Sequence, residues 1–175
     1  KDYHVVAVIG DGALGGGLSF EGLNDAGGSG EPLVVILNDN GMSIDRNVGG
    51  LSKHLSRMRT DPEYYEFKKK YRKTLEKLPA GRTLYEWSHE VKSAVKKTLL
   101  PPLSTVFEEM GFSYMGPVDG HDIQRLTAVL REAREAKRPV LVHVHTVKGN
   151  GYAYALREPE RFHGVPPFDP VTGKV

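Results

Sequence analysis

The sequence predicts an α/β fold in which a parallel sheet is flanked by helices, and three observations support this. Short apolar runs rich in β-branched residues recur along the chain, as in strands of a parallel sheet covered on both faces. Stretches with helical spacing separate these runs. At 175 residues the chain is long enough for one domain with its own core.

The first part of the chain has the pattern of a βαβ unit. Residues 4–9 are a continuous apolar run, which we expect to form a strand buried on both faces. Residues 18–26 have helical spacing, and we expect the glycines and serine at 27–30 to stop that helix. Residues 33–37 predict a second buried strand, which completes the βαβ unit.

The middle of the chain differs from the sheet-forming parts in composition. We expect residues 1–51 and 101–175 to form the sheet core, and residues at about 52–100 to form a helical insertion. A short helix should follow a transition within 47–58. The basic run at 68–73 is flanked by glutamates, which favours a solvated helix face over an anion-binding patch.

The last part of the chain returns to the α/β pattern. Asp122 is the expected N-cap of a helix, because it precedes an apolar pattern with helical spacing. The expected elements are a helix at 103–110, a strand at 112–115, a loop at 116–122, a helix at about 123–137 and a buried strand at 140–146. Gly- and Pro-rich coil should follow.

Composition argues against several classes of function. The net charge is only +2, so no overall field favours a nucleic acid or membrane surface as partner. The absence of cysteine excludes disulfides, thiolate metal sites and a cysteine nucleophile, and fits a reducing compartment. No apolar run approaches membrane-spanning length, and the first residues have no signal-peptide pattern.

The motif GDGALGGG, from Gly10 to Gly17, follows the first predicted strand. It matches the G-x-G-x-x-G fingerprint of dinucleotide-binding domains, and Asp39 lies near the end of the next strand, as that fingerprint requires. Asp11, however, places a carboxylate where backbone amides should meet a pyrophosphate. This repels a diphosphate unless a divalent cation lies between them. An NAD(P)-binding domain remains an alternative.

A magnesium ion would reconcile these features. Mg²⁺ prefers oxygen ligands and is usually shared between protein groups and phosphate oxygens. Asp11 offers a carboxylate, an Asn from the run at 38–40 offers an amide oxygen, and the amide of Gly12 can donate to phosphate. A helix N-cap would explain Asp11 alone, and a simple turn would explain the Asn run alone. Together, at two neighbouring strand ends, they favour a metal–diphosphate site.

Five motifs lie in order along the chain: GDGALGGGLSFEGLNDAG, VVILNDNGMSI, FEEMGFSYMGPVDGHD, TVKGNGY and RFHGVPPFDP. Together they resemble the 1-deoxy-D-xylulose-5-phosphate synthase family, whose transketolase-like members use thiamine diphosphate (ThDP) and Mg²⁺. The resemblance covers nearly the whole chain and is weakest at 55–100. It implies a thiamine diphosphate-binding, transketolase-like fold.

The resemblance also implies the metal ligands and one catalytic residue. Asp11 and Asn40 would bind Mg²⁺ through their side chains, and Met42 would bind it through its backbone carbonyl. His163, in the RFHGVP motif, would face the reacting carbons. A histidine in that position can donate a hydrogen bond or move a proton.

Further residues are implied as cofactor contacts. Backbone amides of Gly12 and Ala13 would contact the diphosphate, and Lys148 would reach it with its side chain. Ile44 would pack near the thiazolium ring, and Tyr152 would line the cofactor site. The implied cofactor-binding set is Gly12, Ala13, Asn40, Ile44, Lys148 and Tyr152.

The implied reaction decarboxylates pyruvate on ThDP and transfers the two-carbon unit to D-glyceraldehyde 3-phosphate. It gives 1-deoxy-D-xylulose 5-phosphate and CO₂, a precursor of isoprenoids, thiamine and pyridoxal. A homodimer in the bacterial cytoplasm or a plastid, not secreted, is implied as well. Transketolase or another ThDP enzyme is the close alternative, and a non-catalytic interaction module is a more distant one.

In the resembled family, the glutamate that activates ThDP and the pocket for its pyrimidine lie in a second domain. We therefore expect this chain to be part of the N-terminal domain, without the pyrimidine-binding and C-terminal domains. The chain alone is expected to be inactive and to need the remaining segments of the same enzyme.

Other histidines are interpreted structurally. His143 and His145 share one face of a predicted strand, which a metal could use, but no third ligand is apparent. His121 is expected to be a loop residue whose backbone leads into the following helix.

Overall fold

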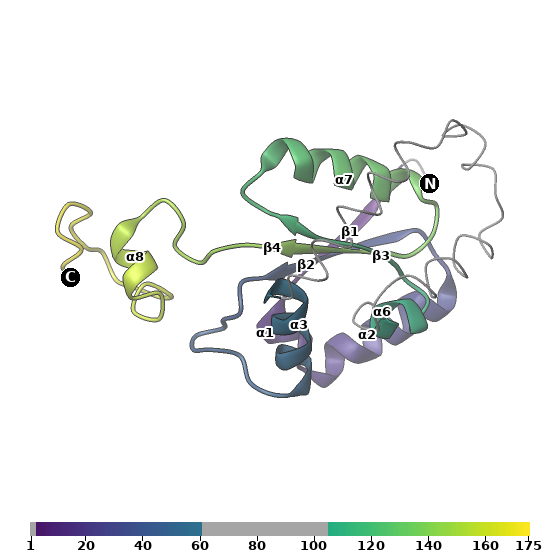
Figure 1. The fold of residues 1–175 in the computed structure, drawn as a ribbon, viewed down its shortest axis with the longest axis horizontal. Helices are drawn as coiled ribbons and strands as arrows, with labels where there is room; N and C mark the ends of the chain where they lie inside the picture. Colours follow the sequence, from purple (N-terminus) through teal and green to yellow (C-terminus); the bar gives the residue numbers. More distant parts are fainter. Residues whose placement is uncertain (1–2, 61–104) are drawn as a thin grey trace.

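The computed structural model describes residues 3–60 and 105–175, and its described part contains one four-stranded sheet (Figure 1). The strands are all parallel, and their order in the sheet is β1-β2-β4-β3. Their bounds are Val5–Gly10 for β1, Leu33–Asp39 for β2, Ser113–Asp119 for β3 and Val140–His145 for β4. The predicted fold class, a parallel sheet with flanking helices, is confirmed.

Helices cover both faces of the sheet (Figure 1). One face carries α7, and the opposite face carries α1, α2, α3 and α6. Their bounds are Asp11–Leu14 for α1, Gly17–Ser29 for α2, Gly50–Thr60 for α3, Thr105–Glu109 for α6 and Ile123–Glu135 for α7. A short helix α8, Ala153–Arg157, lies within the segment that we expected to be coil.

The core is divided by the sheet into two apolar clusters. Strand alternation explains the division, because successive side chains of a strand point to opposite faces. In β4, Leu141 packs in the cluster under α1, α2, α3 and α6, whereas Val140 and Val142 pack in the cluster under α7. All three are fully buried, which agrees with the prediction that this strand is covered on both faces.

The first strand corrects one expectation. Residues 4–9 were expected to be buried on both faces, but Val5, Val6 and Val8 expose 51%, 51% and 71% of their surface. The reason is the place of β1 in the sheet, at the end of the strand order, where it pairs with β2 on one side. An apolar run predicts a strand, but it does not predict the position of that strand in the sheet.

The helix after GDGALGGG is longer than expected. The residues at 27–30 were expected to stop it, but α2 continues to Ser29, and Gly30 is its C-cap with a φ of 70°. Gly27 has a different role, since a Cβ atom there would lie 1.9 Å from the carbonyl oxygen of Met110. Close packing against the segment after α6 therefore requires glycine at this position.

The third strand also extends beyond its prediction. β3 runs to Asp119, so most of the loop expected at 116–122 belongs to the sheet. The pairing of β3 with β4 shifts register between Met115 and Val118, which is an irregularity that simple alternation does not predict. Asp122 is confirmed as the N-cap of α7, since its Oδ1 accepts a hydrogen bond of 3.0 Å from the Arg125 amide.

The expected helical insertion is described only in part. Residues 52–60 belong to α3, in which Leu55 and Met58 are buried in the core. Residues 61–100, with the basic run at 68–73, lie outside the described residues. No helix in the described residues is long and apolar enough to cross a membrane.

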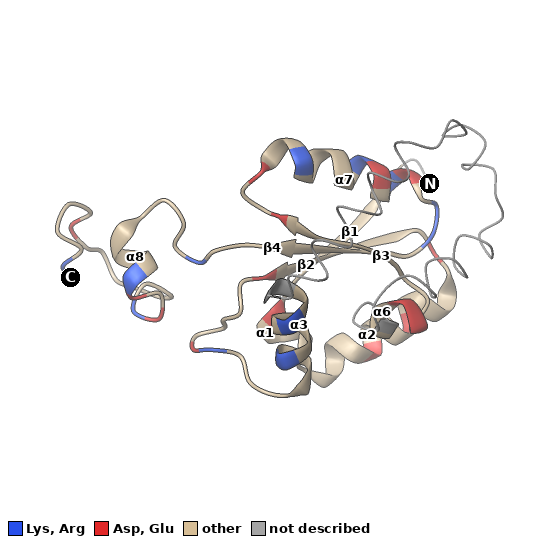
Figure 2. Cartoon of the chain, viewed as in Figure 1, with Lys and Arg blue, Asp and Glu red and all other residues tan. Residues whose placement is uncertain are grey.

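Charged side chains of both signs alternate along α7, whereas α3 carries mainly basic ones and α6 acidic ones (Figure 2). This mixture agrees with the low net charge and is typical of a solvated helical surface.

Candidate functional site

A cavity of about 200 Å³ lies at the carboxyl ends of β1 and β2. These strands are neighbours, with Gly10 paired to Asn38, so the segments that follow them meet at one edge of the sheet. Ligands of open α/β sheets bind at this kind of edge. The residues that line the cavity are Gly10, Asp11, Gly12, Ala13, Asn40, Met42, Ser43, Lys148 and His163.

The cavity therefore unites most of the predicted site residues from three distant segments. A larger cavity of about 460 Å³ adjoins it, because Asp11, Gly12 and Ser43 line both. Ile44 and Tyr152 are predicted site residues that do not line the smaller cavity.

Asp11 joins the two strand ends. It is the first residue of α1, whose N-cap is Gly10, and only 7% of its surface is exposed. Its Oδ2 accepts a hydrogen bond of 2.7 Å from the amide of Gly41, in the turn after β2. Asp11 therefore does not merely begin a helix: it links the GDG motif to the Asn-rich turn.

A second carboxylate, that of Asp39, lies beside Asp11. Its Oδ1 accepts from the same Gly41 amide, at 3.2 Å. Burial raises the pKa of the Asp11 carboxyl, and the hydrogen bond with Asp39 and the negative charge of Asp39 raise it further, against the amides of Gly41 and Asn40. A divalent cation at Asp11 would offset this repulsion, so the pair of carboxylates fits a metal site.

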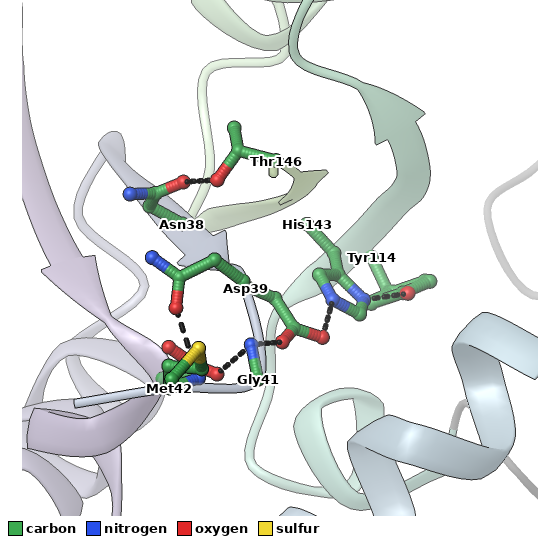
Figure 3. A network of polar contacts seen from close by, with 9 residues as sticks. Asn38, Asp39, Gly41, Met42, Tyr114, His143 and Thr146 are labelled. Atoms are coloured by element: carbon green, nitrogen blue, oxygen red, sulfur yellow. Dashed lines mark hydrogen bonds and ion pairs between the residues drawn. The ribbon is translucent and has the colours of Figure 1, made fainter. Parts of the chain in front are cut away.

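Asn38 and Asp39, the last two residues of β2, point in different directions (Figure 3). The Asn38 amide oxygen accepts a hydrogen bond of 2.7 Å from the Thr146 hydroxyl, beyond the end of β4. Asp39 is fully buried. Asn40 lines the cavity, and its amide oxygen accepts from the Met42 amide at 2.9 Å, which closes a tight turn. The turn thus brings the Asn40 side chain and the Met42 backbone to the same cavity.

Gly12 is required for close packing at the start of α1. A Cβ atom there would lie 2.9 Å from Cβ of Ser43 and 3.1 Å from Oδ1 of Asn47. The absence of a side chain lets the turn after β2 approach α1 and leaves the backbone of Gly12 and Ala13 at the cavity.

Lys148 and His163 line the cavity from the part of the chain that follows β4. The Lys148 ammonium donates hydrogen bonds to the Ser43 carbonyl oxygen, at 2.6 Å, and to Nδ1 of His163, at 2.8 Å. Because an ammonium group only donates, Nδ1 accepts, and the proton of the neutral His163 ring lies on Nε2. The site therefore combines a cation with an imidazole in a defined tautomer.

Ile44 and Tyr152 lie apart from this lining. Ile44 exposes 64% of its surface. The Tyr152 hydroxyl donates to the Pro170 carbonyl oxygen at 3.0 Å. Its ring belongs to an aromatic cluster, with ring centroids 5.6 to 5.8 Å from those of three neighbours: Tyr154, Phe162 and Phe168.

Sequence reasoning missed a chain of buried polar side chains that ends at Asp39 (Figure 3). His143 Nε2 lies 2.8 Å from Oδ2 of Asp39, and His143 Nδ1 lies 2.7 Å from the Tyr114 hydroxyl. Strand alternation could have indicated it, because Asp39 lies two residues after the core residue Leu37 on β2. Among the described residues, no group of three or more His, Asp or Glu is arranged to hold a metal ion.

The role of His121 was also underestimated. Its ring, and not only its backbone, holds the loop that carries Lys148. Nε2 accepts a hydrogen bond of 2.9 Å from the Val147 amide, and Nδ1 lies 3.0 Å from the Asn150 side-chain amide. The only sequence signal for this role was that His121 belongs to one of the motifs of the resembled family. The loop that its ring contacts is distant in the sequence, so local pattern could not indicate the contact.

Comparison with solved structures supports the fold. A transketolase from Campylobacter jejuni superposes with a TM-score of 0.53 over 88% of this chain and 17% of that chain, at 18% sequence identity. At this identity the similarity shows the fold alone.

Sequence comparison gives the family. A family model described as 1-deoxy-D-xylulose-5-phosphate synthase matches residues 1–146. Proteins of that name from Desulforudis audaxviator and Pelotomaculum thermopropionicum are each 51% identical to the chain over 174 residues, which is 99% of the chain and 27% of each relative. The protein of the same name from Clostridium tetani is 48% identical, with 28% of its length covered. The chain thus spans little more than a quarter of these relatives, and it belongs to the 1-deoxy-D-xylulose-5-phosphate synthase family.

Proposed function

We propose that this chain supplies the diphosphate- and Mg²⁺-binding part of a ThDP-dependent transferase. The complete enzyme would decarboxylate pyruvate and transfer the two-carbon unit to D-glyceraldehyde 3-phosphate, giving 1-deoxy-D-xylulose 5-phosphate and CO₂. One observation carries the proposal: residues from three segments, represented by Asp11, Asn40 and Lys148, line one cavity at the carboxyl edge of the sheet. Family membership supports the choice of reaction.

The donor set at the cavity fits Mg²⁺. Asp11 would give a carboxylate oxygen, Asn40 an amide oxygen and Met42 its backbone carbonyl, and all three residues line the cavity. These are hard oxygen donors, of the kind that Mg²⁺ combines with phosphate oxygens and water. The raised pKa of Asp11 is a further argument, because a carboxyl that is buried next to Asp39 lacks a compensating positive charge.

The remaining cavity residues fit a diphosphate. The amides of Gly12 and Ala13 would donate to its oxygens, and the Lys148 ammonium would add a positive charge. Ile44 would then pack near the thiazolium ring, and Tyr152 would line the cofactor site outside the smaller cavity. When bound, ThDP supplies the nucleophilic carbon and the electron sink for decarboxylation.

His163 would act at the reacting end of the site. Its hydrogen bond with Lys148 leaves the proton on Nε2, so the ring can donate that proton or a hydrogen bond to substrate. We expect His163→Ala in the full-length protein to lower kcat by about 100-fold or more. Binding of ThDP should change much less, and an equal loss of both would contradict a catalytic role.

We further propose that residues 1–175 work together with other segments of a longer enzyme, which would hold the pyrimidine and its activating glutamate. The coverage of only 27% of the relatives supports this division. A chain limited to these residues should then bind Mg²⁺ and diphosphate without turnover. Turnover of pyruvate and D-glyceraldehyde 3-phosphate by the 175 residues alone would contradict it.

Calorimetric titration of the full-length protein tests the cofactor. We expect ThDP to bind only when Mg²⁺ is present, and we expect no binding of NAD⁺ or NADP⁺. NAD(P) binding without ThDP binding would replace this proposal with a dinucleotide-binding domain. Release of ¹⁴CO₂ from [1-¹⁴C]pyruvate, dependent on D-glyceraldehyde 3-phosphate, separates the proposed synthase from a transketolase.

Family membership also motivates a homodimeric, cytoplasmic enzyme that feeds isoprenoid, thiamine and pyridoxal synthesis. Light scattering of the full-length protein tests the dimer, with twice the monomer mass expected and a monomer mass as the contradicting result.

A further inference from the structure

A buried polar chain runs from the core to the metal-binding turn, and the functions proposed above leave it unexplained. It consists of Tyr114, His143 and Asp39 (Figure 3). The three residues expose 8%, 0% and 0% of their surface. They lie on the face of the sheet that packs apolar residues such as Leu37 and Leu141. An aliphatic residue could fill the space of His143, so a histidine in this position calls for a specific reason.

The hydrogen bonds of the chain are mutually consistent. A carboxylate oxygen only accepts, so Nε2 of His143 donates to Oδ2 of Asp39, at 2.8 Å. Nδ1 of the neutral ring then accepts from the Tyr114 hydroxyl, at 2.7 Å. Tyr114 is held in turn by Phe107, whose ring stacks on it with centroids 6.1 Å apart. The imidazole is thus fixed from both sides.

Asp39 connects this chain to the turn. Its second oxygen, Oδ1, accepts from the Gly41 amide at 3.2 Å, and Oδ2 of Asp11 accepts from the same amide at 2.7 Å. Gly41 lies between Asn40 and Met42, whose side chain and carbonyl would bind the cation. The position of Gly41 therefore determines where three of the proposed ligands point.

We propose that His143 is a positioning residue for the metal site. By donating a hydrogen bond to Asp39, it fixes the position of the Gly41 amide and so orients Asp11, Asn40 and Met42 toward the cation. The inference rests on the proposed Mg²⁺–diphosphate site. It also explains why Asn40, and not Asp39, lines the cavity. The hydrogen bond from His143 keeps the Asp39 carboxylate in the core.

This role differs from core packing in what it predicts. A packing residue affects the stability of the fold alone, whereas a residue that orients ligands through Asp39 affects metal affinity even in a folded protein. Outer-shell partners of metal ligands typically change affinity by about 10- to 100-fold.

Three variants of the full-length protein test the inference. His143→Leu removes the N–H that Asp39 accepts, whereas His143→Gln keeps an N–H at a similar reach. Tyr114→Phe removes only the hydroxyl. Val142→Ala is the matched control, because Val142 is the neighbouring residue of β4, is fully buried and packs in the cluster on the opposite face.

The measurement is the dissociation constant of Mn²⁺, used as the probe for Mg²⁺, by EPR titration in the presence of ThDP, together with thermal unfolding. We expect His143→Leu to weaken Mn²⁺ binding by about 10- to 100-fold. His143→Gln should restore most of this loss, and Tyr114→Phe should weaken binding by a smaller factor. Val142→Ala should lower the unfolding temperature without changing Mn²⁺ affinity.

Two results would contradict different claims. Wild-type protein that binds no Mn²⁺ with ThDP would overturn the proposed function itself. Wild-type affinity in a folded His143→Leu protein would overturn only the positioning role. If His143→Leu does not fold, Tyr114→Phe decides: unchanged Mn²⁺ affinity in that variant overturns the role, and weakened affinity at normal stability supports it.

Discussion

Asp11 and Asp39 lie at the ends of neighbouring parallel strands, are both buried and accept hydrogen bonds from the same Gly41 amide, yet their surroundings differ. Asp39 has His143 as a buried partner, at 2.8 Å. Asp11 faces a cavity, and its pKa is raised by burial and by Asp39. A buried carboxylate that has a histidine partner is stabilised without a cation, whereas one held against a second carboxylate is suited to binding a cation.

The largest expected effect on stability comes from Asp39. Asp39→Ala leaves the N–H of the buried, neutral His143 ring without its acceptor, and a buried donor left unsatisfied typically costs about 1–3 kcal/mol. Urea unfolding of the full-length protein should show this loss, while Asp25→Ala, at an exposed site on α2, should change stability by less than about 0.5 kcal/mol. An equal loss of stability in Asp39→Ala and Asp25→Ala would contradict a stabilising role for Asp39.

Asp11→Ala should act on metal binding instead. Because Asp11 is a proposed direct ligand, we expect Mg²⁺ affinity in the presence of ThDP to fall by at least about 100-fold, beyond the usual effect of outer-shell residues. Asn40→Ala should weaken binding as well, with less effect because an amide carries no charge. Calorimetry measures both, with Asp25→Ala as control. Unchanged affinity in both variants would refute the shared site.

The raised pKa of Asp11 predicts that the free energy of unfolding of the metal-free protein depends on pH. Its folded-state pKa lies above the ordinary 3.8, so between these two values the folded state binds more protons than the unfolded state. The free energy of unfolding of wild type should therefore fall as the pH rises through this window. Asp11→Asn lacks this dependence.

With EDTA present, urea unfolding at a series of pH values should show Asp11→Asn to be more stable than wild type at pH 7. The difference should disappear below about pH 3.8. A wild-type protein that is the more stable one at pH 7 without metal would contradict this interpretation of Asp11.

The smallest effect is expected at Asn38, which precedes Asp39 on β2. Thr146→Val removes the hydroxyl that donates to the Asn38 amide oxygen at 2.7 Å. One such hydrogen bond contributes about 0.5–1.5 kcal/mol. Urea unfolding should detect the loss without a change in Mg²⁺ affinity, and Thr127→Val on the exposed surface of α7 is the control. A loss of Mg²⁺ affinity would place Asn38 in the site as well.

The two apolar strands β1 and β4 show how far local pattern predicts the fold. Both are correctly predicted as strands from runs of β-branched residues. Of the two, β4 is buried from Val140 to Val144, because it lies between β2 and β3, whereas β1 lies at the end of the strand order. Strand order depends on contacts between segments more than 100 residues apart, and local propensity contains no information about it.

For the site, the residue types were predictable but the supporting contacts were not. Asp11 and Asn40 could be brought together in advance, because the ends of adjacent parallel strands meet at one edge. The ring contacts of His121 with Val147 and of His143 with Asp39 could not. They join groups from separate strands and loops, and the partner of each ring depends on how those segments are arranged in the fold.

By itself, the sequence determined the α/β class, the strands, the helix N-cap at Asp122 and the carboxylate–amide chemistry of the GDG and Asn-rich motifs. These follow from local preferences of the backbone and from the donor atoms that each side chain carries. The tertiary structure decided which of two buried aspartates faces the cavity and which is held by His143. That choice depends on the pairing of β2 with β4, which brings Asp39 and His143 together in an apolar core where only a partnered carboxylate is stable.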